Sequence, residues 1–192
     1  MRWWRQSICF PVIFFIVTTY VDRASAATLV NGANQTGIIF TNTVADSYTF
    51  AANTGDKINL RLGTTNFDGW LQLFGPDGKL LVTGTDSGST DAHIDDYMAT
   101  NSGTFTVLVS SWFPGDTGTY ALHLAQIPEA FIVSGSDQGG AMTGNASYPG
   151  TITLGDLDIW AFTACTGDLI NLRLNTTNFD GWLELFGQMV GC

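Results

Sequence analysis

The sequence is short of basic residues, and this shortage excludes one class of partner. Its 192 residues include 7 Lys and Arg against 17 Asp and Glu, and only 12% are charged. Binding to phosphate backbones needs clusters of Lys and Arg. Nucleic acid is therefore not an expected partner.

Catalytic motifs are also lacking. The chain has 2 histidines, His93 and His123, and neither a Gly-x-Ser-x-Gly turn nor a His-Glu-x-x-His metal motif occurs in it. His123 alternates with Leu122 and Leu124, so it is expected on the opposite, solvent-facing side of a strand. We therefore do not expect this chain to be an enzyme.

Long apolar runs are absent except near the N-terminus. Residues 8–20 read ICFPVIFFIVTTY after a basic start, and Ala24-Ser25-Ala26 has the small-x-small pattern of a cleavage site. We expect residues 1–26 to be a signal peptide, with an N-terminal membrane anchor as the alternative. Cleavage would leave 4 basic and 16 acidic residues, a net charge of −12 (4 − 16), on a secreted or cell-surface chain that does not contact the membrane.

Patterns typical of strands and turns are abundant. Apolar residues alternate with polar ones in residues 47–52, 56–63, 103–111 and 118–126, as in strands that turn one face to a core. Gly75-Pro76-Asp77-Gly78 is expected to join residues 70–74 to 79–84 as a hairpin. No amphipathic helix is predicted. Short strands that recur every 8–12 residues or so indicate a sandwich or barrel.

One segment occurs twice. Residues 46–75 align without a gap on residues 158–187, and 22 of the 30 positions are identical because 8 differ. The offset of 112 residues (158 − 46) is the size of a whole domain. We expect a complete domain at 27–127, a linker and lead-in at 128–148, and an incomplete second copy at 149–192 in a chain that looks cut short. The apolar faces of such a half-domain would lack cover.

Cysteine is scarce. Cleavage of the signal peptide would leave only Cys165 and Cys192. Export permits a disulfide, but the first copy of the repeat has Asn53 at the position of Cys165, so the fold does not require a bridge there. Free thiols are therefore expected.

The order of these patterns resembles one family. Asp-x-Tyr-x-Phe from Asp46 is followed by Thr-Gly-Asp-x-Ile-x-Leu from Thr54, by the Leu-x-Leu-Phe-x-Pro-Asp-Gly hairpin, and by Gly-Thr-Phe and Gly-Thr-Tyr strands from Gly103 and Gly118. The series resembles the bacterial pre-peptidase C-terminal (PPC) domain over residues 35–126, and again over 149–187. This resemblance implies an all-β, antiparallel, jelly-roll-like β-sandwich related to bacterial collagen-binding domains, and a module that is not catalytic.

A second fold is compatible with one motif. Residues 116–120 read DTGTY, which has the Asp-x-Gly-x-Tyr spacing of a tyrosine corner. In that motif the Tyr120 hydroxyl bonds to backbone a few residues upstream. An immunoglobulin-like sandwich is therefore the alternative, although the first unit lacks the Cys-Trp-Cys pattern.

Two short stretches hold the candidate binding residues. Asp68 and Trp70 lie in NFDGW, which is either a ligand loop or a turn whose polar side chains bond local backbone. Trp112 and Phe113 lie in a connection between strands, where they either tuck under the loop or form an exposed contact. An exposed contact would suit an extracellular protein or polysaccharide.

One dense acidic stretch, TDSGSTDAHIDD, carries the candidate metal ligands Asp86, Asp91, Asp95 and Asp96. Their carboxylates are of the kind that binds Ca²⁺. The ordered spacing of a calcium loop is missing, and a solvated loop running into an edge strand is the alternative. No other cofactor is expected.

These patterns predict a non-catalytic, secreted accessory module of a larger extracellular bacterial protein. Its role would be spacing, support of folding or processing, or weak binding of protein or polysaccharide. We expect the rest of that protein to hold a catalytic domain, a protease or another hydrolase. The alternative is a structural or adhesive surface protein built of tandem sandwich repeats.

Overall fold

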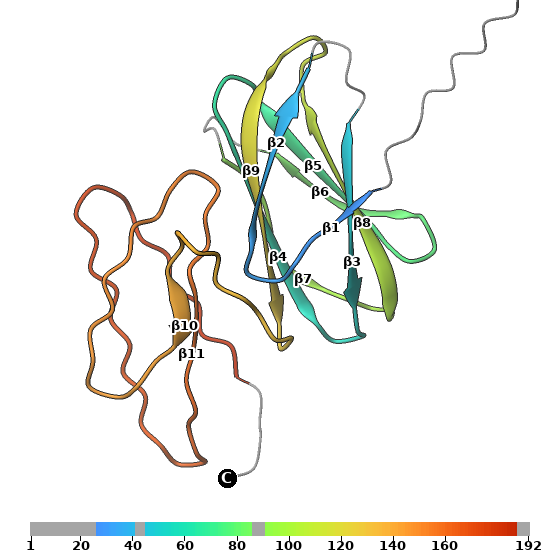
Figure 1. The fold of residues 1–192 in the computed structure, drawn as a ribbon. Helices are drawn as coiled ribbons and strands as arrows, with labels where there is room; N and C mark the ends of the chain where they lie inside the picture. Colours follow the sequence, from blue (N-terminus) through green and yellow to red (C-terminus); the bar gives the residue numbers. More distant parts are fainter. Residues whose placement is uncertain (1–25, 41–44, 86–90, 188–192) are drawn as a thin grey trace, which may run out of the picture.

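A computed structural model describes residues 26–40, 45–85 and 91–187, and the regular structure within them is entirely β (Figure 1). None of the described segments forms a helix able to cross a bilayer. The expected signal peptide lies outside the described residues apart from Ala26. The strands of the first unit are β1 (Ala27–Thr28), β2 (Asn34–Ile39), β3 (Asp46–Ala52), β4 (Lys57–Thr64), β5 (Gly69–Phe74), β6 (Leu80–Thr85), β7 (Asp91–Met98), β8 (Gly103–Ser111) and β9 (Gly118–Ile127).

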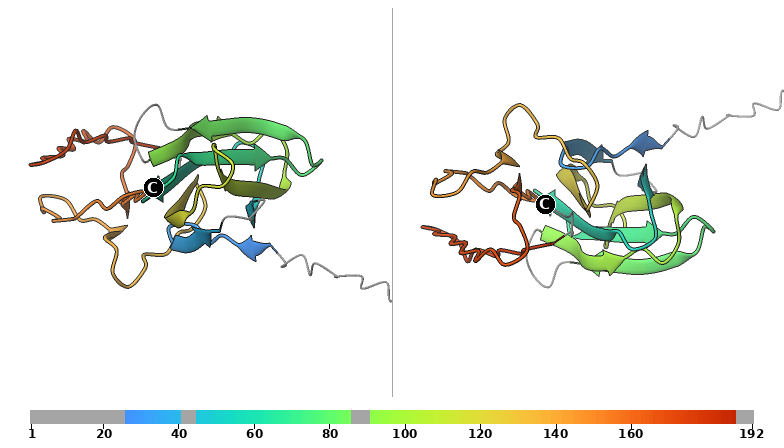
Figure 2. Two further views of the ribbon diagram at one scale, coloured as in Figure 1. Left: turned by 90° about the horizontal axis from the view of Figure 1, so that it is seen from above. Right: turned by 90° about the horizontal axis from the view of Figure 1, so that it is seen from below.

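Strands β2 to β9 form a jelly roll. One sheet has the order β2-β9-β4-β7 and the other β1-β3-β8-β5-β6, and Figure 2 shows the two as stacked layers. Apart from the β5–β6 hairpin, each strand from β3 to β9 lies in the opposite sheet from the strand before it. Two such sheets joined by Greek-key connections define a jelly roll, which confirms the predicted fold. The short β1 pairs in parallel with β3, so this sheet is mixed and not purely antiparallel.

The core lies between the two sheets, and the alternating apolar residues form it. Phe105, Val107 and Val109 of β8 are buried, as predicted from their spacing. On the facing sheet Leu60 and Leu62 of β4 are completely buried. Each such side chain contributes about 1.5–3 kcal/mol relative to exposure. This interior therefore dominates the stability of the first unit.

The predicted turn joins β5 to β6. The Gly75 amide donates to the Lys79 carbonyl at 2.9 Å, and the Gly78 amide donates to the Gly75 carbonyl at 2.9 Å. Gly78 has a φ of +75°, a conformation that residues with a Cβ rarely adopt. The hairpin prediction is confirmed.

Tyr120 does not form a tyrosine corner. Its hydroxyl donates to Oδ2 of Asp46 at 2.6 Å and lies 2.6 Å from the hydroxyl of Tyr48. Both partners belong to β3 in the facing sheet, whereas a corner tyrosine bonds backbone a few residues upstream. Tyr120 therefore connects the two sheets, and the tyrosine-corner interpretation is wrong.

Residues 128–187 contain two short strands, β10 (Gly139–Ala141) and β11 (Ile159–Ala161), which pair in parallel. Motif residues whose counterparts form the core of the first unit are exposed here. Leu183 is 54% exposed, whereas its counterpart Leu71 is completely buried. In the part of the chain that the structure describes, no strands cover the apolar residues of this half.

The turns of the repeated segment nevertheless have the same local geometry in both copies. The Thr64 hydroxyl donates to the Phe67 carbonyl at 2.5 Å, and the Thr176 hydroxyl donates to the Phe179 carbonyl at 2.7 Å. Such bonds link residues three apart, so they need only the local sequence.

The two copies of the repeat differ at Cys165, which is disulfide-bonded. The expectation of free thiols is therefore wrong for this residue.

Candidate functional site

The NFDGW turn and the SWFPGD connection lie together at one end of the sandwich. Gly69 of β5 pairs with Ser111 of β8, so the chain before β5 and the chain after β8 leave the sheet side by side. The Trp112 amide donates to the Asp68 carbonyl at 2.8 Å. The structure therefore brings all four predicted binding residues to one place: Asp68, Trp70, Trp112 and Phe113. We call Trp70, Trp112 and Phe113 the aromatic end.

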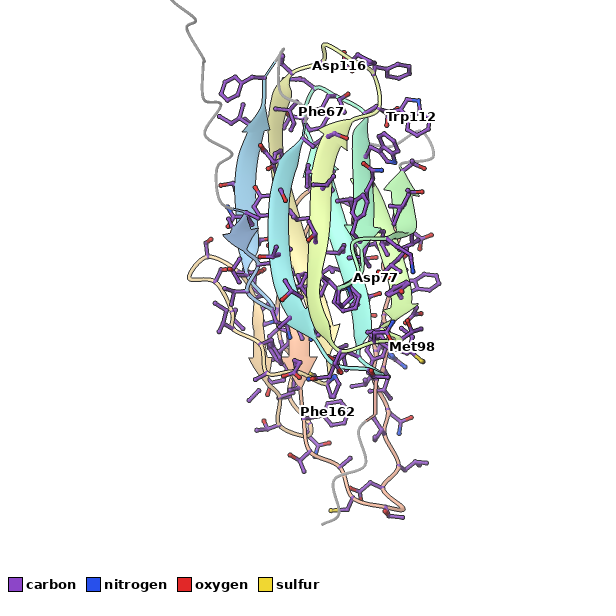
Figure 3. The ribbon with its side chains drawn as sticks, turned by 90° about the vertical axis from the view of Figure 1, so that its right-hand side faces the viewer. Phe67, Asp77, Met98, Trp112, Asp116 and Phe162 are labelled. Carbon is purple, nitrogen blue, oxygen red and sulfur yellow. The ribbon has the colours of Figure 1, made fainter. Side chains whose placement is uncertain are left out.

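The outer rings of the aromatic end face solvent. Trp112 is 50% exposed and Phe113 is 56% exposed, and Figure 3 shows Trp112 at the extremity of the sandwich beside Asp116. The rings of Trp70 and Trp112 meet edge to face, with centroids 5.2 Å apart and planes inclined at 67°. Trp70 itself is partly buried. Trp112 and Phe113 are therefore exposed and not tucked under the loop, and their role as a binding contact stays a prediction.

Hydrogen bonds restrain the connection that carries these rings. The Ser111 hydroxyl donates to Oδ2 of Asp116 at 3.3 Å and accepts the Phe113 amide at 3.2 Å. The Asp116 amide donates to the Phe113 carbonyl at 3.4 Å. A loop that is ordered beforehand loses less conformational entropy when it binds. The connection that carries Trp112 and Phe113 is thus restrained in the free chain.

Much of the NFDGW motif serves the turn itself. Phe67 is only 5% exposed and packs edge-on against Tyr120, with ring centroids 6.5 Å apart. A Cβ at Gly69 would lie 2.9 Å from the Cγ2 atom of Thr64, so a larger residue would have to displace buried side chains. The turn interpretation accounts for Phe67 and Gly69, and of this motif only Trp70 packs against an exposed ring of the aromatic end.

The acidic residues of β7 lie beside basic side chains. Arg61 lies 3.7 Å from a carboxylate oxygen of Asp91 and 3.3 Å from one of Asp95. Lys57 pairs with Asp96 at 3.0 Å, while Asp86 lies outside the described residues. Much of the negative charge here is balanced within the chain, and the calcium site expected at these four residues stays a prediction.

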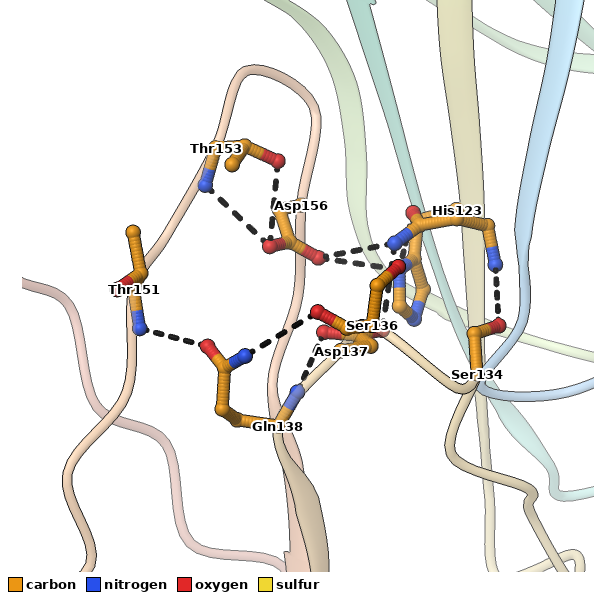
Figure 4. Close-up of polar contacts among 9 residues, drawn as sticks. His123, Ser134, Ser136, Asp137, Gln138, Thr151, Thr153 and Asp156 are labelled. Atoms are coloured by element: carbon orange, nitrogen blue, oxygen red, sulfur yellow. Dashed lines mark hydrogen bonds and ion pairs between the residues drawn. The ribbon is translucent and has the colours of Figure 1, made fainter.

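His123 lies in a different environment from the one predicted. It projects from the outer face of β9, opposite Leu122 and Leu124, but its side chain is completely buried. The segment from Ser134 to Asp156 runs over this face (Figure 4). The prediction of a solvent-facing His123 is therefore wrong, because a segment that follows β9 covers the strand. Its alternation with leucines carried no information about that cover.

Carboxylates gather around His123. Its Nδ1 atom lies 3.7 Å from Oδ1 of Asp156 and 3.0 Å from the amide oxygen of Asn34. His123, Asp137 and Asp156 each offer one atom that could bind a metal ion, and these three atoms lie within 4.8 Å of one another. We call these residues, together with Asn34 and Asp158, the junction cluster. The sequence analysis missed it, because its members are scattered over residues 34–158.

Burial and like charge act in different ways on the carboxylates of the junction cluster. Burial, followed by the charges of Asp156 and Asp137, raises the pKa of Asp158 to about 6. Burial also acts to raise the pKa of Asp156, but its hydrogen bonds act more strongly in the other direction. The hydrogen bond from His123 contributes most, and the pKa of Asp156 lies below its ordinary value. Asp156 is therefore the firmly ionised carboxylate, and Asp158 is the one that takes up a proton most readily.

Gly63 of β4 allows the covering segment to approach the sheet. A Cβ at this position would lie 2.4 Å from the carbonyl carbon of Leu154 and 2.5 Å from the amide nitrogen of Gly155. Because backbone atoms are in the way, Gly63→Ala is expected to displace this turn while the core of the first unit stays intact. Hydrogen exchange of the amides of residues 151–158 should accelerate roughly tenfold.

A matched control is Gly144→Ala in the same half of the chain. Nothing lies within 4 Å of a Cβ at Gly144, so exchange in residues 151–158 should not change. Equal protection in the Gly63→Ala variant and in the unaltered chain would contradict the close docking of the segment on β4.

The fold and these surfaces define a class of protein: a jelly-roll β-sandwich whose exposed aromatic rings lie on a connection outside its core. Residues 44–111, which run from just before β3 to the end of β8, match the sequence model of the bacterial pre-peptidase C-terminal domain. Residues 44–111 of the first unit therefore match the PPC family, as the resemblance of the sequence predicted.

Solved structures of low sequence identity are also similar to this chain. The pre-peptidase C-terminal domain of the collagenase from Bacillus anthracis is 16% identical, with 52% of this chain and 94% of that chain covered and a TM-score of 0.46. PliG of Aeromonas hydrophila, a periplasmic inhibitor of g-type lysozyme, is 12% identical to this chain. The match covers 53% of this chain and 96% of PliG, with a TM-score of 0.40. PliG of Salmonella Typhimurium is 18% identical, with coverage of 53% and 97% and a TM-score of 0.38. No curated protein matches the chain.

Proposed function

We propose that this chain is a secreted, non-catalytic accessory module that binds an extracellular polymer, polysaccharide or protein, through the aromatic end. The observation that carries the proposal is the half-exposure of Trp112 and Phe113 on a restrained connection of the PPC domain. Aromatic rings bury a large apolar area with little loss of side-chain freedom, and they dominate many binding surfaces. A rigid scaffold that carries its binding residues on a loop is a common arrangement.

The charge of the chain narrows the choice of polymer. The net charge is −10, so long-range repulsion disfavours polyanions. Polymers of low charge density are therefore the proper probes: chitin and cellulose for the polysaccharides, and gelatin for the proteins.

The test is a binding isotherm of the full chain on each of these three insoluble polymers. We expect saturable retention on at least one of them, and the double variant Trp112→Ala/Phe113→Ala should weaken it by tenfold or more, roughly what the loss of one or two central aromatic contacts costs. The polymer that retains the chain identifies the ligand as polysaccharide or protein.

Met98→Ala is the matched control. Met98 is 57% exposed and lies at the opposite end of the sandwich from Trp112 (Figure 3). Its replacement should leave the isotherm unchanged. Retention on none of the polymers, or retention that the double variant does not diminish, would contradict the proposed site.

The sequence repeat favours a second form of this function. Because 22 of 30 positions recur 112 residues later, the module also suits a structural or adhesive surface protein made of tandem sandwich units. The gene sequence downstream of codon 192 distinguishes the two forms. A hydrolase domain there supports the accessory module, and further copies of the repeat without catalytic motifs support the surface protein.

A further inference from the structure

The junction cluster draws its side chains from both halves of the chain. Asn34 and His123 are paired neighbours on β2 and β9 of one sheet. Asp137 and Asp156 come from two separate turns of the segment that follows β9. The side-chain Nδ2 atom of Asn34 donates to Oδ2 of Asp137 at 3.2 Å and to Oδ1 of Asp156 at 3.4 Å. Four elements of the chain thus converge on one point (Figure 4).

Hydrogen bonds within the cluster leave buried polar atoms without a partner. His123 is completely buried; its Nδ1 atom is directed at the carboxylate of Asp156, and its Nε2 atom has no hydrogen-bond partner. Oδ1 of Asp158 is likewise buried without a partner. Three carboxylates therefore lie around one imidazole: the side chains of His123 and Asp156 are 0% and 4% exposed, whereas Asp137 and Asp158 are partly exposed. Such an arrangement is costly unless a cation neutralises it.

We propose that the junction cluster binds a divalent transition-metal ion of the zinc class, with His123, Asp137 and Asp156 as its ligands. An imidazole nitrogen combined with carboxylate oxygens suits Zn²⁺ and its neighbours in the first transition row, whereas Ca²⁺ takes six to eight oxygen ligands. Three protein ligands leave a fourth, tetrahedral position for a water molecule.

The geometry requires only a small closure of the cluster. With metal–ligand bonds of about 2.0–2.1 Å, the ligand atoms of a tetrahedral site lie roughly 3.4 Å apart. The Nδ1 atom of His123 is already 3.7 Å from Oδ1 of Asp156. One ligand atom from each of the three residues can be chosen so that all lie within 4.8 Å of one another. Rotation of the partly exposed Asp137 side chain, which is carried on a turn, supplies the remaining movement.

The ion would cross-link the two halves of the chain. His123 belongs to the first sandwich, whereas both carboxylates belong to the segment that leads into the repeat. This role is independent of the aromatic end, because none of its residues belongs to the junction cluster. Failure of polymer binding therefore leaves the metal proposal untouched, and the reverse is also true.

The test is titration calorimetry of the full chain, freed of metal by a chelator, with ZnCl₂ and separately with CaCl₂. We expect one Zn²⁺ per chain and no comparable Ca²⁺ binding. Loss of a ligand should weaken Zn²⁺ binding by a factor of roughly 100. Removing a residue that only supports a metal ligand costs roughly 10- to 100-fold, and a direct ligand should contribute at least as much. Hydrogen exchange in residues 134–158 should also slow when Zn²⁺ is added.

The variants are chosen so that a folding defect cannot be mistaken for loss of the site. His123→Ala removes a buried ligand, and Asp137→Asn removes a ligand from outside the sandwich, where folding of the core does not depend on it. His93→Ala removes the other histidine, which lies 3.5 Å from Asp95 on the edge strand, and should leave affinity within about twofold. No saturable Zn²⁺ binding, equal or tighter Ca²⁺ binding, or affinity insensitive to Asp137→Asn would overturn the proposal.

Discussion

Leu71→Ala is expected to lower the free energy of unfolding of the first unit by about 2–5 kcal/mol, the range found for buried leucines that leave a cavity. Leu71 is completely buried between the two sheets. The same change at Leu183, its counterpart in the repeated motif, should alter stability by no more than about 0.5 kcal/mol. Leu183 is 54% exposed, so its truncation removes little packing.

Urea unfolding followed by tryptophan fluorescence measures both variants on the same chain. The comparison is well controlled, because the ten residues around each leucine differ only at Gln72, which is Glu184 in the second copy. If Leu183→Ala were as destabilising as Leu71→Ala, the second copy would have to bury its motif in solution. Such a result would contradict the exposure observed here.

Tyr120→Phe is expected to lower stability by about 1.5–3 kcal/mol at neutral pH, the usual contribution of a hydrogen bond to a charged group. The hydroxyl donates to the carboxylate of Asp46 at 2.6 Å and is shared with Tyr48. Removing it leaves the Asp46 oxygen without this donor and breaks a link between the two sheets. Tyr48→Phe should have a smaller effect, because the bond between Tyr120 and Asp46 remains.

The same variant should change the response to alkaline pH. Burial, followed by the hydrogen bonds to Asp46 and Tyr48, raises the pKa of Tyr120 far above its ordinary value. An unfolded tyrosine loses its proton near pH 10, whereas the folded Tyr120 keeps it. The stability that this group contributes is therefore fully present below pH 10 or so and is lost as the pH rises further.

Each tyrosine held neutral in this way makes unfolding easier by up to about 1.4 kcal/mol per pH unit above its unfolded pKa. The pKa of Tyr48 is raised too, chiefly by burial, so the unaltered chain should lose stability through both groups. Tyr120→Phe removes one of them, and the gap between variant and unaltered chain should narrow above pH 10. Urea unfolding at pH 7, 9, 10 and 11 measures it, and parallel loss of stability in the two proteins would contradict the assignment.

Sequence reasoning predicted the sandwich because its evidence is local. The alternation of Phe105 with polar neighbours defines one face of a strand, whatever that face meets. The turn at Gly78 needs a positive φ, which a glycine adopts without penalty. Each of these features was therefore predictable before the tertiary structure was known.

The candidate sites were predicted less completely. Trp112 and Phe113 were singled out as large apolar residues in a connection, but two alternatives remained, tucked or exposed. Their meeting with the NFDGW turn follows from the pairing of β5 with β8, which no local pattern specifies. His123 was placed on the correct face of β9 and in the wrong environment, since the residues that cover it lie beyond the end of the strand.

By itself, the sequence determined which residues turn to the same side of each strand, where the chain reverses, and that the stretch at residues 46–75 recurs at 158–187. Only the tertiary structure decided which of these residues are buried. Leu71 and Leu183 have nearly the same neighbours in sequence, yet one is enclosed and the other is not. The physical reason is that burial is a property of contacts between distant segments: a leucine leaves water only when the strands of a second sheet cover it, and His123 only when residues 134–156 fold back over its strand.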